Sequence, residues 1–349
     1  MTATPTGDAL VLVVASPLER EHVERIAAVD PGRLRVVYEA DLLSVPEYVG
    51  DHHGTPPELD ESGLARWRSL VADADILFDF DWCQPETLPE RAPRLRWIQA
   101  TSSGIGGFLA RTELNRSSIV FTTAAGIHAV PLAEFVLLCL LYFAKDIPIL
   151  NARKSERHWE RHTSAELSGQ RILVVGLGRV GGEIARRCAA NGIEVWGMRR
   201  DASGPIPEGV RRLVSRADLR DSLPEVQGLV LACAHTPETH HLIGHEELKL
   251  LPGDAVLVNV ARGEILDEPA LIDALQEGRL RGAGLDVFET EPLPAESPLW
   301  DAPNVLISPH SASTVDAEND RIVDIFVENL RRYLDGRPLL NVFDSSRGY

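Results

Sequence analysis

Short apolar runs alternate with polar or helix-length stretches along the first third of the chain. The runs are ALVLVVAS (9–16), LRVVY (34–38), DILFDF (75–80), LRWIQA (95–100) and SIVFTT (118–123). Apolar runs of this length, bounded by turn-forming segments, are typical of strands buried on both faces of a parallel sheet. The rhythm predicts an α/β domain built on a doubly wound parallel sheet.

A second series of the same kind begins at Arg171. Its apolar runs cover residues 171–175, 193–197, 228–233, 255–260, 282–287 and 304–308, and the stretches between them have the length and charge of helices. Strands that alternate with helical stretches indicate βαβ units and a parallel sheet. The sequence therefore predicts the α/β class, with two doubly wound parallel-sheet domains.

Two helical segments flank the second series. Residues 130–144 are almost continuously apolar after Pro131, a residue that suits the first turn of a helix. Near the end of the chain, apolar residues recur every four positions and stop before Gly336, which predicts an amphipathic helix; they are Ile322, Phe326, Leu330 and Leu334. No apolar run of strand length follows, so we expect this helix to return to the first domain. The expected domains are residues 1–125 plus 313–349, and residues 126–312.

Length, composition and charge fit a folded cytoplasmic protein. The 349 residues suit two domains, and 44% are hydrophobic and 25% charged. No basic segment precedes the first apolar run, and the longest apolar stretch is shorter than a membrane span of about 20 residues, so we expect no secretion signal and no membrane segment. Four dispersed cysteines indicate reduced thiols. The net charge of -17 would repel nucleic acid and anionic membranes, so neither is an expected partner.

A glycine-rich turn follows the run RILVV and precedes a helical stretch. In GLGRVG, Gly176 permits a tight turn, Gly178 lets the backbone approach a pyrophosphate, and Gly181 lets helix and strand pack closely. The helix N-terminus then points at the phosphates, so Arg179 and Val180 are also expected cofactor contacts. The motif by itself could be an ordinary turn. In the strand, turn and helix context, it predicts a dinucleotide-binding domain.

The end of the next predicted strand indicates which dinucleotide is bound. A carboxylate there would accept a hydrogen bond from the ribose of NAD, but the strand ends in Met198-Arg199-Arg200. A guanidinium can grip the 2'-phosphate of NADP through two charge-assisted hydrogen bonds. We therefore expect NADP(H) to be preferred, with Arg199 the leading contact and Arg200 in support, and NAD(H) to be possible. In the alternative interpretation both arginines are solvated and Asp201 serves NAD.

Polar residues that could carry chemistry follow three of the later strands. They are Arg262 in NVARGEILDE, Asp286 and Glu291 in GLDVFETEPLP, and His310 in SPHSAS. Ligands of open α/β sheets bind beyond the carboxyl ends of the strands, which is where all three segments lie. Taken singly, each residue could equally be a surface charge or a structural histidine.

With GLGRVG, HTPET (235–239) and this Arg, Glu, His order, the chain resembles the D-2-hydroxyacid dehydrogenase family over nearly its whole length. The resemblance implies a flavodoxin-like substrate domain, formed by both chain ends, and an inserted Rossmann NAD(P)-binding domain. It also implies a homodimer. Among cofactor contacts it implies Thr236, Val260 and Asp286, the last holding the nicotinamide carboxamide.

The chemistry of a 2-oxo acid can be matched to these residues. Its carboxylate needs a cation, and Arg262 would bind that group and polarise the carbonyl. Its ketone oxygen needs a proton as hydride arrives at carbon, and His310 would supply it as general acid, reversing to general base for a 2-hydroxy acid. Glu291, within reach of the imidazole, would favour its charged form and fix its orientation.

The first domain offers a loop for the substrate. LRWIQATSSGIGG ends a strand in a small, glycine-rich loop whose amides could cradle a carboxylate, with Ser102, Ser103 and Gly104 as candidates, although a simple turn would explain it as well. Asp81-Trp82-Cys83 holds no arginine where relatives that act on phosphorylated acids tend to carry one, so such a substrate is less expected. Ala234 stands where the family's LPLTPET stretch usually has proline. With no regulatory domain after Tyr349, we expect no serine feedback.

The histidines do not predict a metal site. His158 and His162 stand in HWERH, where the glutamate is one position off the zinc-protease pattern. The adjacent pairs 52–53 and 240–241 would diverge in a helix or strand. We expect no metal.

Two functions therefore remain: an NADP(H)-linked reductase of small 2-oxo acids such as glyoxylate or hydroxypyruvate, and a dinucleotide-sensing regulatory protein on the same fold. A formate-type dehydrogenase is less expected, since that reaction needs no general acid.

Overall fold

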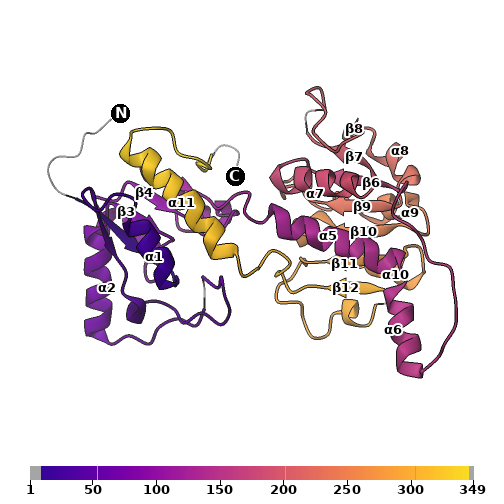
Figure 1. The fold of residues 1–349 in the computed structure, drawn as a ribbon, viewed down its shortest axis with the longest axis horizontal. Coiled ribbons are helices and arrows are strands. Elements are labelled where there is room, and N and C mark those ends of the chain that lie inside the picture. The colour runs from indigo at the N-terminus through magenta and orange to yellow at the C-terminus, as the bar shows by residue number, and fades with distance from the viewer. Residues whose placement is uncertain (1–8, 53, 201, 303, 346–349) are drawn as a thin grey trace. The chain divides into compact units, whose positions relative to one another are not determined.

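The computed structural model describes residues 9–52, 54–200, 202–302 and 304–345 (Figure 1). Its contacts divide the chain into two compact units, Met1–Ile127 with Val315–Tyr349, and His128–Thr314. The sequence had placed the boundaries at 125/126 and 312/313. Asp201, the alternative partner for the ribose of NAD, lies outside the described residues.

The first unit is built on a five-stranded parallel sheet with the strand order β2-β1-β3-β4-β5. This is the flavodoxin-like order. Each predicted run forms a strand at its apolar centre, and the strands are β1 (Leu10–Val14), β2 (Leu34–Val37), β3 (Ile76–Phe78), β4 (Trp97–Gln99) and β5 (Val120–Thr122). The helices of its N-terminal part are α1 (Arg20–Ala27), α2 (Glu61–Asp73), α3 (Leu88–Arg91) and α4 (Gly106–Arg111), with short 3-10 turns at Ala40–Leu42, Pro85–Thr87 and Leu114–Arg116.

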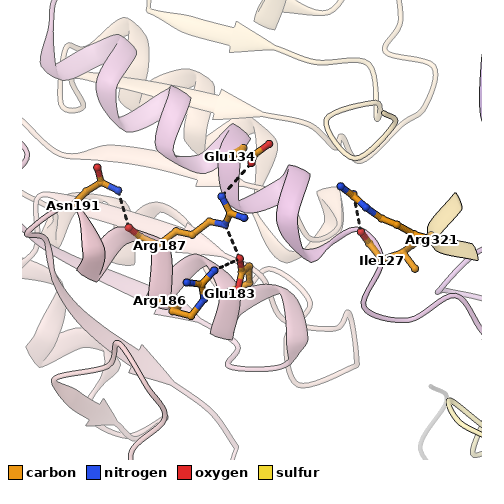
Figure 2. A network of polar contacts seen from close by, with 7 residues as sticks. All are labelled: Ile127, Glu134, Glu183, Arg186, Arg187, Asn191 and Arg321. Carbon is orange, nitrogen blue, oxygen red and sulfur yellow. Dashed lines mark hydrogen bonds and ion pairs between the residues drawn. The ribbon is translucent and has the colours of Figure 1, made fainter. Parts of the chain in front are cut away.

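The C-terminal helix α11 (Glu318–Leu334) packs in this first unit. Its apolar stripe closes one face of the sheet, where the Phe326 ring lies 5.0 Å from that of Phe78 and 5.2 Å from that of Trp97. Near the start of the helix, Arg321 donates to the Ile127 carbonyl at 3.3 Å (Figure 2). The chain ends therefore share one core, although nearly 200 residues separate α11 from β5.

The second unit holds a seven-stranded parallel sheet with the order β12-β11-β10-β9-β6-β7-β8. The order reverses between β6 and β9, which makes a switch point at the carboxyl ends of these strands. The strands are β6 (Arg171–Val175), β7 (Glu194–Met198), β8 (Arg212–Val214), β9 (Gly228–Leu231), β10 (Val256–Asn259), β11 (Gly282–Leu285) and β12 (Val305–Ile307). The helices are α5 (Ala129–Ala144), α6 (Ile147–Glu156), α7 (Arg179–Ala190), α8 (Leu219–Ser222), α9 (His245–Leu250) and α10 (Glu268–Gln276), with 3-10 turns at Leu223–Glu225, Gly263–Ile265 and Pro298–Trp300.

Helices α5 and α7 pack side by side on one face of this sheet (Figures 1 and 2). Arg187 on α7 donates to Glu183 one turn earlier at 2.6 Å and to Glu134 on α5 at 3.1 Å. Cys139 and Cys188 lie in the core between helices and sheet, and burial raises the pKa of both thiols to about 12. Both cysteines therefore act as core residues. No helix in the described parts of the chain is long and apolar enough to cross a bilayer.

Candidate active site

The glycine turn lies where β6 enters α7. Gly176 has φ 96, its N–H donates to the Met198 carbonyl at the end of β7 at 2.8 Å, and a Cβ there would lie 2.6 Å from the backbone of Cys233. A Cβ at Gly181 would lie 1.8 Å from the Gly176 carbonyl oxygen. The first and third glycines are therefore required by contacts within the protein itself.

The second glycine is different. A Cβ on Gly178 would meet no atom within 4 Å, so the space beside this backbone is open. Gly178 is also the N-cap of α7, a helix of 12 residues, and Arg179 and Val180 form its first turn. An open backbone at the N-terminus of a helix fits the pyrophosphate of a dinucleotide, which needs N–H donors and positive potential. The residues present therefore fit the cofactor that the motif predicts.

The two arginines follow β7 directly. Arg199 donates to the Pro205 carbonyl at 3.1 Å, while its Nε is buried with no hydrogen-bond partner in the described chain. Arg200 is exposed and lies 3.6 Å from Glu238. Glu238 also accepts from the Thr236 hydroxyl at 2.9 Å. Arg200 and Thr236, two predicted cofactor contacts, are thus linked through one carboxylate.

Arg262, Glu291 and His310 all lie beyond the carboxyl ends of neighbouring strands. Arg262 follows β10, and the buried Asn259 fixes this turn by donating to the Arg262 carbonyl at 3.0 Å and accepting from the Ala261 N–H at 3.1 Å. The Arg262 guanidinium donates to the Ala261 carbonyl at 2.6 Å and has no acidic partner among the described residues. Its charge is available to an anion. Val260 in the same segment is buried, and its N–H donates to the Leu231 carbonyl.

His310 and Glu291 form a hydrogen-bonded pair. The Nδ1 atom of His310 lies 2.7 Å from Oε2 of Glu291, and the two side chains are 44% and 35% exposed. The second oxygen, Oε1, accepts from the Phe288 N–H at 3.0 Å, which fixes the carboxylate plane. With Nδ1 held, Nε2 is the imidazole nitrogen left for a substrate. The exposure of the pair makes it accessible.

Asp286 is buried and organises the loop that carries His310. Its Oδ1 accepts from the Ser308 hydroxyl at 2.7 Å and from the Ala312 N–H at 2.9 Å, and its carbonyl accepts from the His310 N–H at 2.9 Å. His310 itself has φ 52, in the left-handed region. Sequence reasoning missed Ser308, because a serine two residues before a candidate histidine gives no signal that its hydroxyl meets a carboxylate 22 residues earlier.

The predicted substrate loop follows β4 in the first unit. Ser102 and Gly104 are exposed, and the Ser102 carbonyl accepts from the Ala124 N–H at 3.0 Å. Thr101 donates to Asp79, a residue with φ 70, at 3.1 Å, which fixes the start of the loop. Ser103 is half-buried. This loop and the Arg262 segment belong to different units, so their grouping stays a prediction.

One expectation about the histidines is wrong. The rings of His240 and His241 do not diverge but stack, with centroids 4.2 Å apart and 15° between their planes. The reason is that His241, with φ 46, ends a turn rather than continuing a helix or strand. Within the described residues no group of three or more His, Cys, Asp or Glu side chains could hold a metal ion.

The chain belongs to the D-isomer specific 2-hydroxyacid dehydrogenases. A model of their NAD binding domain matches residues 137–312. Glyoxylate/hydroxypyruvate reductase B of Pectobacterium carotovorum is 32% identical over 289 residues, which cover 80% of this chain and 86% of that protein. D-3-phosphoglycerate dehydrogenase of Methanocaldococcus jannaschii is 31% identical over 306 residues, which cover 86% of this chain but only 57% of that protein.

A solved structure shows the same fold throughout. The D-isomer specific 2-hydroxyacid dehydrogenase of Xanthobacter autotrophicus, solved in complex with NADPH and MES, matches 98% of this chain and 100% of its own, with 31% identity and a TM-score of 0.76. The protein is therefore an oxidoreductase of this family with an NAD(P)-binding Rossmann fold and a second parallel-sheet domain.

Proposed function

We propose that this protein reduces a small 2-oxo acid to a D-2-hydroxy acid with NADPH, in a site formed by Arg262, His310 and Glu291. The observation that carries the proposal is the His310–Glu291 pair at 2.7 Å, together with the Arg262 guanidinium at the end of a neighbouring strand, which has no acidic partner in the described chain. An acid held by a carboxylate and a free cation are the two groups that reduction of a 2-oxo acid needs.

The substrate carboxylate pairs with Arg262, whose guanidinium also polarises the carbonyl oxygen. Glu291 accepts from Nδ1–H of His310, and in the imidazolium form the proton on Nε2 passes to the carbonyl oxygen as the alcohol forms, which leaves a neutral imidazole. The nicotinamide, when bound, supplies the hydride. In the reverse direction His310 takes the hydroxyl proton. We further propose that Ser102, Ser103 and Gly104 bind the substrate from the first domain, residues 1–125 plus 313–349, and that residues 126–312 hold the dinucleotide.

We propose the turn Gly176, Gly178, Arg179, Val180 and Gly181 as the pyrophosphate site. The remaining cofactor contacts would be Arg199, Arg200, Thr236, Val260 and Asp286. The buried, unpartnered Nε of Arg199 supports NADPH over NADH, because an unpaired buried donor is costly and the 2'-phosphate would bring acceptors to this guanidinium. The NADPH in the Xanthobacter relative supports the same choice.

The test is a panel of 2-oxo acids, with glyoxylate, hydroxypyruvate and bulkier analogues, run with NADPH and with NADH. We expect turnover and a kcat/KM at least about tenfold higher with NADPH, a difference of roughly 1.4 kcal/mol. Arg199→Ala should remove most of that preference. A clear NADH preference would overturn the arginine argument. Tight NADPH binding without turnover of any 2-oxo acid would instead favour the dinucleotide-sensing protein.

The acid itself is tested by His310→Asn, because asparagine tolerates the left-handed backbone that His310 adopts. We expect kcat to fall by about 10²–10⁴ with NADPH affinity unchanged by fluorescence titration. His245→Asn, at an exposed histidine on α9, is the matched control and should leave kcat intact.

A further inference from the structure

Four segments follow the carboxyl ends of the neighbouring strands β9, β10, β11 and β12, and we call them the strand-end segments: residues 235–241, 262–268, 286–291 and 308–312. Glu289 contacts two of the others. Its Oε1 lies 2.7 Å from Nε2 of His241, and it also accepts from the Glu268 N–H at 3.4 Å. The Glu289 N–H donates in return to Oε2 of Glu268 at 3.3 Å. This one residue therefore joins three of the four segments.

His241 is an unusual residue for its position. Its φ of 46 lies in the left-handed region, which is strained for a residue with a Cβ and which glycine adopts freely. Its N–H donates to the Glu264 carbonyl at 2.8 Å, and its ring stacks on that of His240. Besides the ring stacking, a histidine in place of glycine here gains a polar contact that glycine cannot make, the bond to Glu289. Strain of this kind points to a role for the side chain.

The contact lies close to the acid of the reaction. Glu289 is two residues from Glu291, and the N–H of Phe288, between Asp286 and Glu289, donates to Oε1 of Glu291 at 3.0 Å. Glu291 in turn holds His310. Any shift of the 288–289 backbone therefore moves the donor that orients the Glu291 carboxylate.

We propose that His241 and Glu289 are positioning residues, which fix the backbone of residues 288–291 and so hold Glu291 against His310. The inference rests on the proposed function and adds a connection to it. Thr236, a proposed cofactor contact, lies in the same segment as His241, so the pair ties the segment that meets the dinucleotide to the segment that holds the acid.

The surroundings explain why histidine suits this position. Glu268 is half-buried, and its pKa is raised by burial and by the nearby charge of Glu289. Two carboxylates this close repel each other unless at least one of them accepts from a donor. His241 supplies that donor at Nε2, while His240 covers its ring and lies 3.3 Å from His235. Without His241, we expect Glu289 to turn toward solvent and release the 288–289 backbone.

The test compares His241→Gly, Glu289→Ala and the double variant. His241→Gly is suited to the purpose because glycine accepts the backbone conformation, so the fold should be retained while the contact is lost. Asn304→Gly is the matched control, since Asn304 also has a left-handed φ of 54 in the second unit and lies at the opposite end of β12 from His310. Glu289→Gln keeps an oxygen acceptor and should retain most of the activity.

With NADPH and the best 2-oxo acid, we expect His241→Gly to lower kcat about tenfold and to change both KM values less than about threefold, a loss of roughly 1.4 kcal/mol confined to the transition state. The double variant should be no slower than Glu289→Ala, because each single change already removes the same contact between the two side chains.

Hydrogen exchange gives a reading that needs no turnover. The amides of residues 287–291 and 308–312 should exchange faster in His241→Gly than in the wild type or Asn304→Gly. If the wild type turns over no 2-oxo acid but these amides still exchange faster in His241→Gly, the positioning role would be supported and the proposed reaction would be overturned. Unchanged exchange, a kcat within twofold of the wild type, or multiplicative losses in the double variant would each overturn the positioning role.

Discussion

At the scale of single residues, Gly263 sets how closely the Arg262 segment approaches the segment that carries Glu291. A Cβ on Gly263 would lie 1.9 Å from the carbonyl carbon of Phe288 and 2.3 Å from the Glu289 nitrogen. Both are backbone atoms, which cannot swing aside as the end of a flexible side chain can. Only glycine permits this close approach, which places the segment that carries Arg262 against the segment that carries Glu291.

Gly263→Ala should therefore displace the 288–289 backbone. We expect a loss of about 2–3 kcal/mol in the free energy of unfolding, the scale of overpacking in a dense core, together with a fall in kcat as Glu291 loses its orienting N–H. Urea unfolding and steady-state kinetics measure the two effects. Gly253→Ala is the control, since a Cβ there meets nothing within 4 Å, and it should be neutral or slightly stabilising. Equal stability of the two variants would contradict the close approach.

Residue types, spacing and the family resemblance together made Arg262, Glu291 and His310 the candidates, because cation, carboxylate and acid follow successive strands and the carboxyl ends of parallel strands share an edge. The residues that hold the site in place could not be predicted from the sequence. The bonds from Ser308 to Asp286 and from His241 to Glu289 join residues 22 and 48 positions apart, and neither pair has a spacing that marks it. The stacked His240 and His241 were mispredicted because a left-handed residue reverses the usual divergence of neighbouring side chains.

At the scale of elements, apolar runs located the strands well and failed at β8. Its three residues Arg212–Val214 form one of the two outer strands of the seven-stranded sheet, and only Val214 of the three is buried. An edge strand flanked by charged residues has no apolar run to detect. The amphipathic helix predicted from the four-residue pattern is α11, and the helix predicted after the glycine turn is α7; each buries an apolar stripe on its sheet.

The polar pairs on α7 give a prediction of their own. Glu183 accepts from Arg186 and Arg187, and these hydrogen bonds lower its pKa from 4.5 to about 2 (Figure 2). A lowered pKa stabilises the folded state above pH 4.5, and the contribution is lost as the pH falls from 4.5 toward 2. Because Glu183 lies near solvent, we expect Glu183→Gln to lower the free energy of unfolding at pH 7 by about 1–2 kcal/mol, which is less than the whole pKa shift would correspond to.

Urea unfolding at pH 7 and pH 4 checks this, since the difference in the free energy of unfolding between wild type and Glu183→Gln should already be smaller at pH 4. The matched control is Glu134→Gln. Glu134 pairs with the same Arg187 but from an exposed position on α5, so it should contribute less than about 0.5 kcal/mol. If this difference in the free energy of unfolding grew as the pH fell, the predicted direction of the pH dependence would be wrong.

At the scale of the whole molecule, several large apolar side chains of the second unit are exposed to solvent. Leu138 and Leu141 on α5 and Ile149 and Leu150 on α6 are between 42% and 52% exposed, and Trp159 just beyond α6 is 94% exposed. Large apolar groups gathered on consecutive elements mark an interaction surface. We propose that a second copy of the chain covers this surface, in line with the homodimer that the family resemblance implies.

Light scattering after size exclusion should then give twice the chain mass of 38.3 kDa at micromolar concentration. Replacing Leu150 and Trp159 together by serine should shift the protein toward the monomer, because losing two large side chains from an interface of standard size removes several kcal/mol of apolar burial. Ile206→Ser is the control: that residue is 56% exposed in another part of the same unit, so its loss should leave the mass unchanged. A wild type that runs as a monomer would refute the dimer, and a dimer that survives the double replacement would place its interface elsewhere.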